Sequence, residues 1–275
     1  MKTFANRLLV KKAGVKVPPK FLAATHDGEN MNIFIRFLTA AACAATAQLA
    51  SAGDVTGKIT LKGTPPSGPE MPLKTDAFCS KIKDITDAAA NPHMPWYVVD
   101  KNGGLADVFI YIKEGLAGKT FEPPAQPAIL DQVQCQYTPY VSGLQSKQKL
   151  LVKNSDPLPH NVHPMPTVAG NKESNKFQPA GTAPLEYTFD NSEVFLRFKC
   201  DVHGWMFAYV GVVDHPYFAV SGKDGTFKIS NLAPGEYVIE AVHRKTHPSG
   251  KGVTQKIKVG ADGAKADFTI EAPAQ

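Results

Sequence analysis

One cysteine, two histidines and one methionine could together hold a metal ion. Cys200, His203 and Met206 follow one another at intervals of three residues, and His160 lies 40 residues earlier. A thiolate, two imidazoles and a thioether suit copper that cycles between Cu(I) and Cu(II). Three donors on one short loop can converge on an ion, and a histidine from a neighbouring strand can close the site. The sequence therefore predicts one copper ion held by these four residues.

His163 opens an alternative reading of the site. If His163 were a ligand beside His160, Cys200 and His203, one cysteine and three histidines would form a zinc-like set. Met206, at the spacing of a copper loop, argues against this reading. Side chains alternate between the two faces of a strand, so we expect His163 to point away from His160 and to lie at the surface.

The N-terminal residues carry the pattern of a secretory signal. From Met31 the chain has one cation, Arg36, then an apolar run that ends in Ala50-Ser51-Ala52. The run is too short for a membrane span, although an N-terminal anchoring helix is an alternative. We expect residues 1–52 to be a leader whose signal peptide starts at about residue 31, and the mature chain to be periplasmic with no membrane span.

The leader also explains the charge of the chain, which carries 30 Lys and Arg against 25 Asp and Glu. Residues 1–52 hold seven of the basic and two of the acidic residues, so the remainder carries 23 of each. A neutral body cannot neutralise a run of phosphates. Nucleic acid is therefore excluded as an expected partner.

Export leaves three cysteines in an oxidising compartment, because Cys43 leaves with the leader. Two of them can pair, and the third needs another role. Since Cys200 has a histidine and a methionine close by, we expect a Cys79–Cys135 disulfide and a free Cys200 thiolate. A disulfide that includes Cys200 is the alternative.

The mature chain is typical of an all-β protein. Turn-forming residues separate short alternating or β-branched runs, which favours β-sandwiches over α/β folds. The predicted strands are 55–61, 108–112, 149–152, 187–189, 194–198, 209–213, 226–229, 237–242, 254–259 and 266–270. A boundary near Asp214 divides a copper domain, 53–213, from a smaller module, 214–275.

The site motifs resemble those of the cupredoxins. Pro-His-Asn-Val-His from Pro159 and Cys-x₂-His-x₂-Met from Cys200 are most similar to amicyanin and pseudoazurin. The resemblance covers roughly residues 105–213 and implies a Greek-key β-sandwich with a type 1 (blue) copper site. It also implies that Asn161 hydrogen-bonds to the cysteine loop. Gly204-Trp205 departs from the Pro-Phe of amicyanin-like loops, and the loss of the proline removes a fixed φ angle beside His203.

The C-terminal residues resemble a second family. The signature DG-x-F-x-I from Asp224, followed by L-x-PG-x-Y from Leu232, is similar to carboxypeptidase regulatory-like, transthyretin-like modules. This resemblance implies a second, prealbumin-like β-sandwich. Residues 53–63 look like the first strand of the same fold and are predicted either to pair with this module or to belong to a simple tandem arrangement.

Two classes of function follow from these patterns. The first is a periplasmic carrier of single electrons between redox proteins, such as a c-type cytochrome and a dehydrogenase, with Trp205 as an exposed docking residue beside His203. The second is copper storage or delivery, or a structural cupredoxin module. An enzyme is not expected, because the sequence lacks the motifs of multicopper oxidases, binuclear copper centres and common hydrolases.

Overall fold

The computed structural model describes residues 51–82, 93–245 and 251–273. The predicted leader, residues 1–52, lies outside this part of the chain apart from its last two residues. The described residues form an all-β protein in which strands assemble into four sheets. Two short 3-10 turns, η1 (Leu73–Thr75) and η2 (Cys79–Lys81), are helical, and no helix in the described ranges is long and apolar enough to cross a membrane.

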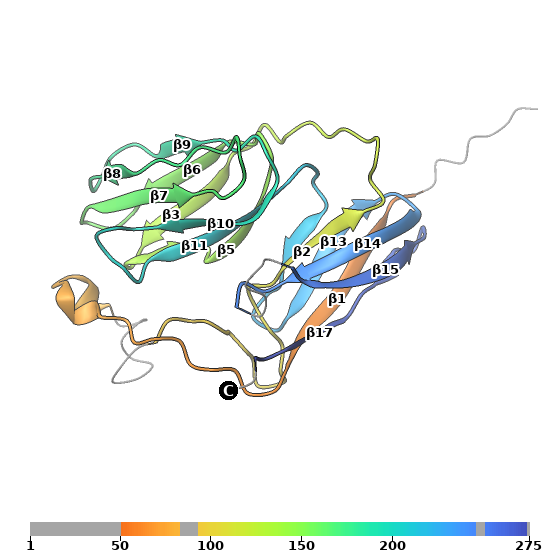
Figure 1. Cartoon of the computed structure of the whole chain (residues 1–275), viewed down its shortest axis with the longest axis horizontal. Coiled ribbons are helices and arrows are strands. Elements are labelled where there is room, and N and C mark those ends of the chain that lie inside the picture. Colours follow the sequence, from red (N-terminus) through yellow and green to blue (C-terminus); the bar gives the residue numbers. More distant parts are fainter. Residues whose placement is uncertain (1–50, 83–92, 246–250, 274–275) are drawn as a thin grey trace, which may run out of the picture. The chain divides into compact units, whose positions relative to one another are not determined.

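The first β-sandwich contains the predicted ligands and consists of two sheets (Figure 1). One sheet has the strand order β5-β11-β10-β7-β8, and the other has the order β4-β3-β6-β9. The strands are β3 (Ala128–Val133), β4 (Gln136–Thr138), β5 (Val141–Gln145), β6 (Leu150–Asn154), β7 (His160–Met165), β8 (Lys176–Gln178), β9 (Leu185–Tyr187), β10 (Glu193–Lys199) and β11 (Phe207–Val213).

The second β-sandwich is built from strands that precede and follow those of the first in the sequence. One sheet joins β13, β1, β16 and β17, and the other has the order β12-β2-β14-β15. The strands are β1 (Gly53–Lys62), β2 (Phe109–Glu114), β12 (Phe218–Val220), β13 (Thr226–Leu232), β14 (Gly235–Val242), β15 (Val253–Val259), β16 (Ala264–Lys265) and β17 (Phe268–Glu271).

The chain divides between the two sandwiches differently from the expected boundary at residue 214. Strand β1 pairs with β13, β16 and β17, so residues 53–62 lie in the sheet of the C-terminal residues, which is one of the two arrangements expected for residues 53–63. Strand β2 was expected in the copper domain, but it pairs with β12 and β14. The sequence alone allows its apolar side chains to pack in either core. The pairing of β2 with β14 places it in the second sandwich.

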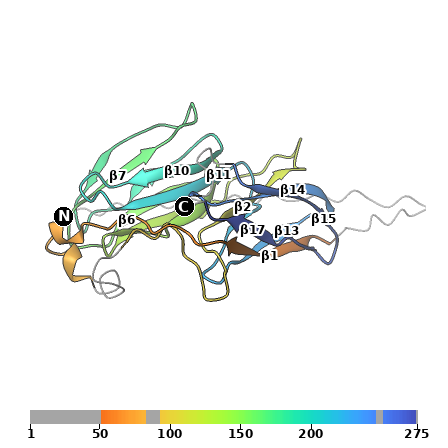
Figure 2. The same cartoon turned by 60° about the horizontal axis from the view of Figure 1, so that its bottom comes forward.

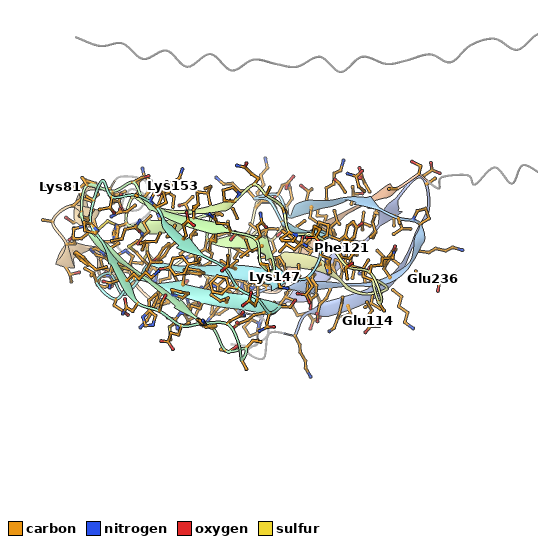
Figure 3. The ribbon with its side chains drawn as sticks, turned by 90° about the horizontal axis from the view of Figure 1, so that it is seen from above. Lys81, Glu114, Phe121, Lys147, Lys153 and Glu236 are labelled. Carbon is orange, nitrogen blue, oxygen red and sulfur yellow. A yellow bond between two sulfur atoms is a disulfide. The ribbon has the colours of Figure 1, made fainter. Side chains whose placement is uncertain are left out.

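Each sandwich buries its own apolar cluster, as the alternation of its strands predicts. In the first, Leu196 and Phe198 of β10 point inward with Leu150 and Val152 of β6. In the second, the inward side chains include Ile59 from β1. Charged side chains extend outward from the ribbon, and Lys81, Lys153 and Glu236 are examples (Figure 3).

Candidate metal centre

The predicted donors meet where two neighbouring strands of the first sandwich end. His160 is the first residue of β7, and Cys200 directly follows β10. The two strands are antiparallel neighbours, with Lys199 opposite His163, so the start of β7 lies beside the end of β10. The loop from Cys200 to Met206 then leads into β11. Strand pairing thus brings together residues that are 40 positions apart.

Three of the predicted ligands converge in the interior. Nδ1 of His160 lies 3.0 Å from Nδ1 of His203, and Sγ of Cys200 lies 3.9 Å and 3.8 Å from these two nitrogens. Bonds of about 2.0 to 2.3 Å to one metal ion would separate three ligands in a plane by about 3.5 to 3.8 Å. The two distances from Sγ lie close to this range, whereas the two nitrogens lie closer together than it. The three atoms can still surround one ion, and a thiolate with two imidazoles is a donor set that copper favours.

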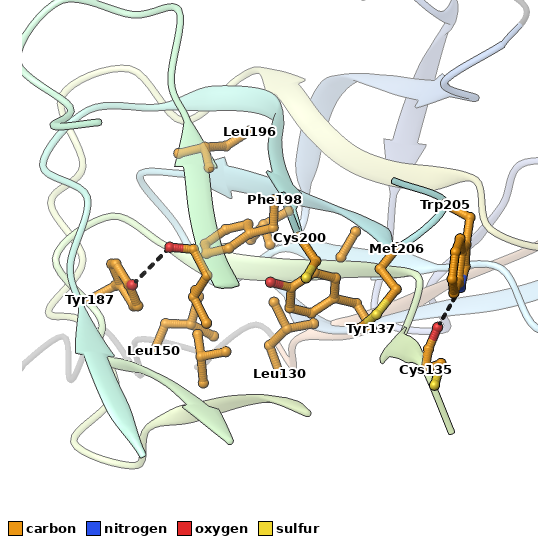
Figure 4. Close-up of a cluster of buried hydrophobic side chains, with 14 of the residues drawn as sticks. Leu130, Cys135, Tyr137, Leu150, Tyr187, Leu196, Phe198, Cys200, Trp205 and Met206 are labelled. Atoms are coloured by element: carbon orange, nitrogen blue, oxygen red, sulfur yellow. Dashed lines mark hydrogen bonds between the residues drawn. The ribbon is translucent and has the colours of Figure 1, made fainter. Parts of the chain in front are cut away.

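Backbone hydrogen bonds stabilise the ligand loop, which runs from Cys200 to Met206. The N–H of Cys200 donates to the carbonyl of Met206 at 3.1 Å, and the N–H of Met206 donates to the carbonyl of His203 at 2.9 Å. Met206 lies in the same buried cluster as Cys200 (Figure 4). The exposed fractions of His160, Cys200, His203 and Met206 are 0, 1, 3 and 1%. Water has almost no access to the four predicted donors.

Asp156 orients His160 from the side opposite to the other donors. Its Oδ2 lies 2.9 Å from Nε2 of His160. Burial by itself lowers the pKa of His160, but the hydrogen bond to Asp156 and the Cys200 thiolate outweigh it and raise the pKa to about 9. The ring is therefore fixed with Nδ1 directed at Cys200 and His203.

Asp156 also holds the turn that carries one half of the disulfide. Gln134 and Cys135 join β3 to β4, and both have positive φ angles, 55° and 54°, which are costly for residues other than glycine. Their backbone N–H groups donate to Asp156 at 2.6 Å and 2.8 Å. One carboxylate thus stabilises both the turn and the imidazole of His160.

Cys200 is prepared as a thiolate. Burial raises the pKa of its thiol, but hydrogen bonds from His160, His203 and the backbone N–H of Asn161 outweigh burial and lower the pKa to about 6. The N–H of Asn161 lies 3.2 Å from Sγ. The thiolate is the form that binds a metal, so the folded chain presents the ligand in its reactive state at neutral pH.

Asn161 contacts the cysteine loop directly through its backbone and indirectly through its side chain. The direct bond comes from its backbone, whereas its side chain donates to Asn175 at 2.9 Å. Asn175 in turn donates to Asp201, the residue after Cys200. The side chain of Asn161 therefore reaches the loop through Asn175, because β8 and its preceding turn lie between the two.

His163 lies outside the donor cluster, as the alternation of β7 predicts. Its Nδ1 lies 2.8 Å from Asp201 and its Nε2 lies 2.8 Å from Glu173. Lys199 pairs with the same Asp201 carboxylate at 2.6 Å. These contacts place the imidazole of His163 in a surface ion-pair network instead of a cysteine-and-three-histidine metal set.

The two remaining cysteines are joined, as the sequence predicted. Cys79 and Cys135 form a disulfide, and Cys200 is free and buried. Cys79 belongs to η2, so the bond ties residues 71–82 to the turn between β3 and β4. Met71, Leu73, Cys79 and Ile82 of this segment enter the same apolar cluster as the ligands.

This segment overturns the prediction that Trp205 is an exposed docking residue. Only 7% of Trp205 is exposed, its Nε1–H donates to the carbonyl of Cys135 at 3.1 Å, and its ring lies 5.2 Å from that of His203 (Figure 4). A charged group also lies beside His203, because Oδ2 of Asp76 is 3.5 Å from its Nε2. A segment more than 100 residues upstream covers this edge.

Two functional residues escaped the sequence analysis. Asp156 lies in a stretch that was interpreted only as a turn, although its position four residues before His160 is a local signal. Asp76 has no comparable signal, since 127 positions separate it from His203. Only its place three residues before Cys79 links it to the site.

Similarity to known proteins was found among solved structures. No protein-family model and no curated protein matches the sequence. A purple cupredoxin from Nitrosopumilus maritimus aligns with 20% identity and a TM-score of 0.27, covering 31% of this chain and 98% of that protein. A mutant of amicyanin in the Cu(I) state aligns with 20% identity and a TM-score of 0.29, covering 33% of this chain and 86% of the other.

A third similar structure is a copper-containing nitrite reductase from Thermus scotoductus. It aligns with 17% identity and a TM-score of 0.28, covering 36% of this chain and 24% of the reductase. These neighbours are cupredoxin-like proteins, matched over about a third of this chain. At such scores the matches say nothing about function, which has to be inferred from the geometry of the donors. The likeness of the C-terminal residues to a carboxypeptidase regulatory-like module stays a prediction.

Proposed function

We propose that this protein binds one copper ion through His160, Cys200 and His203, with Met206 as a weaker fourth ligand, and carries single electrons between redox proteins. The observation that carries the proposal is the convergence of two imidazole nitrogens and a thiolate within 3.9 Å of one another in the interior. Copper would supply a one-electron couple at this position.

The chain itself contributes orientation and the exclusion of water. Asp156 fixes the imidazole of His160, the N–H of Asn161 holds the Cys200 thiolate, and the two backbone bonds of the ligand loop fix His203 and Met206. Groups held in this way need to move little when the charge at the site changes. A small rearrangement is what a carrier of single electrons requires.

The proposal does not include catalysis. The cavity beside Trp205 and Met206 has a volume of about 20 Å³, which is room for a single water molecule. A substrate would need a concave site of several hundred Å³. This cavity is far smaller, so it has no room for a substrate beside the ligand loop.

Partners and location belong to the same proposal. The signal-like leader favours the periplasm, where a c-type cytochrome or a dehydrogenase would exchange electrons with the protein. Because Trp205 is buried, docking near His203 would instead involve the covering segment, in which Phe78 is 38% exposed. Such encounters are small and transient, so one exposed aromatic side chain can contribute a large share of the contact.

Copper storage or delivery is the second candidate, and one observation favours it. His203 is only 3% exposed, because residues 71–82 and Trp205 cover it. A covered ligand slows the exchange of electrons with a partner more than it affects the retention of an ion.

An optical spectrum and an exchange measurement separate the two candidates. The purified mature chain would be loaded with Cu(II), and the copper content would be measured. An intense thiolate-to-copper band together with rapid exchange with a one-electron redox protein supports the carrier. The band with slow exchange supports storage. One equivalent of bound copper without the band would contradict a type 1 site.

A further inference from the structure

Residues 71–82 form a cap on the donor end of the first sandwich. The chain leaves β1, runs to this end and makes the turns η1 and η2 there (Figures 1 and 2). Met71 lines the small cavity together with Trp205 and Met206, and Leu73 is buried in the same cluster. The cap is therefore packed against the ligand loop and anchored by the Cys79–Cys135 disulfide.

The cap presents one carboxylate to the donors. Oδ1 of Asp76 accepts the backbone N–H groups of Phe78 at 2.8 Å and Cys79 at 2.9 Å. These two bonds fix the orientation of the carboxylate within its own turn. Its other oxygen, Oδ2, remains directed at Nε2 of His203, 3.5 Å away.

The ring of His203 is oriented with its Nε2 toward this carboxylate. Its Nδ1 faces His160 and Cys200, so Nε2 is the ring atom on the far side. Only 4% of the side chain is exposed, which leaves little access for water. The contact is longer than a hydrogen bond of good geometry, and because a carboxylate accepts hydrogen bonds and does not donate them, it favours the tautomer of His203 with its proton on Nε2. That tautomer leaves Nδ1 free to bind a metal.

The Cys79–Cys135 disulfide and Trp205 hold the cap and the ring of His203 in place. Cys79 lies three residues after Asp76 and is bonded to Cys135, whose carbonyl accepts the Nε1–H of Trp205. The indole of Trp205 lies against the ring of His203. The imidazole is thus held between the Asp76 carboxylate and the Trp205 ring, and both are fixed to the same disulfide.

We propose that Asp76 is a positioning residue for the metal site, which holds His203 with Nδ1 toward the metal and adds a fixed negative charge that favours Cu(II) over Cu(I). The proposal rests on the proposed copper function. A carboxylate bonded to the second nitrogen of a ligand histidine fixes the tautomer and makes the ligand more basic. A negative charge in a buried site stabilises the more positive oxidation state of a nearby ion.

The test uses the full mature chain with Asp76→Asn, in which the amide oxygen still accepts the N–H groups of Phe78 and Cys79 but the charge is gone. Asp76→Glu restores the charge. Glu186→Gln is the matched control, because it removes an exposed carboxylate, paired with Lys149, from the same sandwich. The measurements are the visible spectrum, the affinities for Cu(II) and Cu(I), and the reduction potential at constant pH.

We expect Asp76→Asn to keep the visible band and to reduce the ratio of Cu(II) to Cu(I) affinity by about three- to tenfold, where tenfold corresponds to a potential 59 mV higher. Asp76→Glu should recover part of the change, and Glu186→Gln should leave the ratio at its wild-type value. An unchanged ratio in Asp76→Asn would overturn the proposal.

Nitrogen NMR of the metal-free protein tests the contact without copper. The wild-type spectrum should show the proton of His203 on Nε2, and Asp76→Asn should shift this signal while Glu186→Gln does not. A wild-type protein without the visible band would contradict the proposed function. A His203 signal that is the same in wild type and Asp76→Asn would contradict the role of Asp76, whatever the spectrum of the copper form.

Discussion

Each sandwich holds a histidine that is buried beside ionisable groups, and the pKa values of these two histidines, His160 and His243, are shifted in opposite directions. His160 in the first sandwich is 0% exposed, and His243 after β14 in the second is 2% exposed. Asp156 and the Cys200 thiolate raise the pKa of His160 to about 9 against the effect of burial. Burial, reinforced by the positive charges of Arg244 and Lys245, lowers the pKa of His243 to about 3.

The difference shows what distinguishes a site for chemistry from a structural residue. The His243 ring stacks on Tyr97 with centroids 4.8 Å apart, so it is used as a flat, uncharged surface. His160 is hydrogen-bonded at both nitrogens and lies beside the Cys200 thiolate, so its Nδ1 is placed where it could bind a metal ion. Equal burial thus leads to unlike roles, because the neighbours of one imidazole are anionic and those of the other are cationic and aromatic.

The largest effect should come from Cys200→Ser, which removes the thiolate that helps to raise the pKa of His160. We expect the intense visible band to disappear and the Cu(II) affinity to fall by more than about a hundredfold, since a hydroxyl is a poor ligand for copper. Copper titration with absorption spectroscopy measures both. The β-sandwich should stay folded by circular dichroism, and a variant that keeps the band would refute the ligand assignment.

The second largest effect concerns His243 and acid stability. Between pH 6.5 and 3 the unfolded chain binds a proton at this residue and the folded chain does not, so the free energy of unfolding falls as the pH falls. We expect a contribution of about 3 kcal/mol lost between pH 7 and pH 4. Urea unfolding at both pH values measures it.

His243→Phe is the matched variant for this measurement, because it keeps an aromatic ring beside Tyr97 but does not titrate. The difference between pH 7 and pH 4 should be smaller in the variant by about the same 3 kcal/mol. An equal pH dependence in both proteins would show that other groups cause the acid sensitivity. His160 has the opposite sign in the metal-free protein: its contribution is present at low pH and is lost as the pH rises through about 9.

A smaller effect is expected from Asp156→Asn, which weakens the anionic surroundings of His160. One oxygen of Asp156 contacts His160 and Cys135 and the other accepts the N–H of Gln134, so a single amide oxygen can keep at most two of the three contacts. We expect the Cu(II) affinity to fall about tenfold, or about 1.4 kcal/mol. Asp190→Asn, an exposed acid on the same sandwich, is the control for loss of charge. Equal affinities in the two variants would mean that packing alone orients His160.

Met206→Gln should have the smallest effect. A weak axial ligand tunes the potential and contributes little to binding, so copper should be retained and the Cu(II) to Cu(I) affinity ratio should change by less than about tenfold. Voltammetry measures the change, and Met165→Gln, a partly exposed methionine on β7, is the control. Loss of copper in the Met206 variant would show that this residue holds the ion in place.

The sequence predicted those parts of the site that are encoded locally. The loop from Cys200 to Met206 carries its spacing within seven residues, and the runs around β10 and β11 alternate clearly enough to place them beside each other. Strand β7 was given no bounds, although alternation was expected around His163, because Pro159 and Pro164 interrupt its pattern. The disulfide was predictable because only two other cysteines remain after export.

Long-range packing was beyond the sequence. Trp205 was expected at the surface because the cupredoxin resemblance implies an apolar, solvent-facing ring around His203, whereas residues from Met71 onward cover this edge here. The contact of Asp76 with His203 depends on the same packing. The place of β2 depends on its pairing with β14, and an apolar strand does not reveal which of two cores it enters.

The pairing of β1 with β17 has a consequence for the order in which the protein acquires its structure. Lys62 meets Glu271 across 209 positions of the chain, whereas the strands of the first sandwich all lie between residues 128 and 213. Contacts between distant positions form slowly, because a long loop must close first. During synthesis, the residues of the donor end can assemble before β1 meets its partner strand, so the proposed metal ligands could come together before the C-terminal sheet exists.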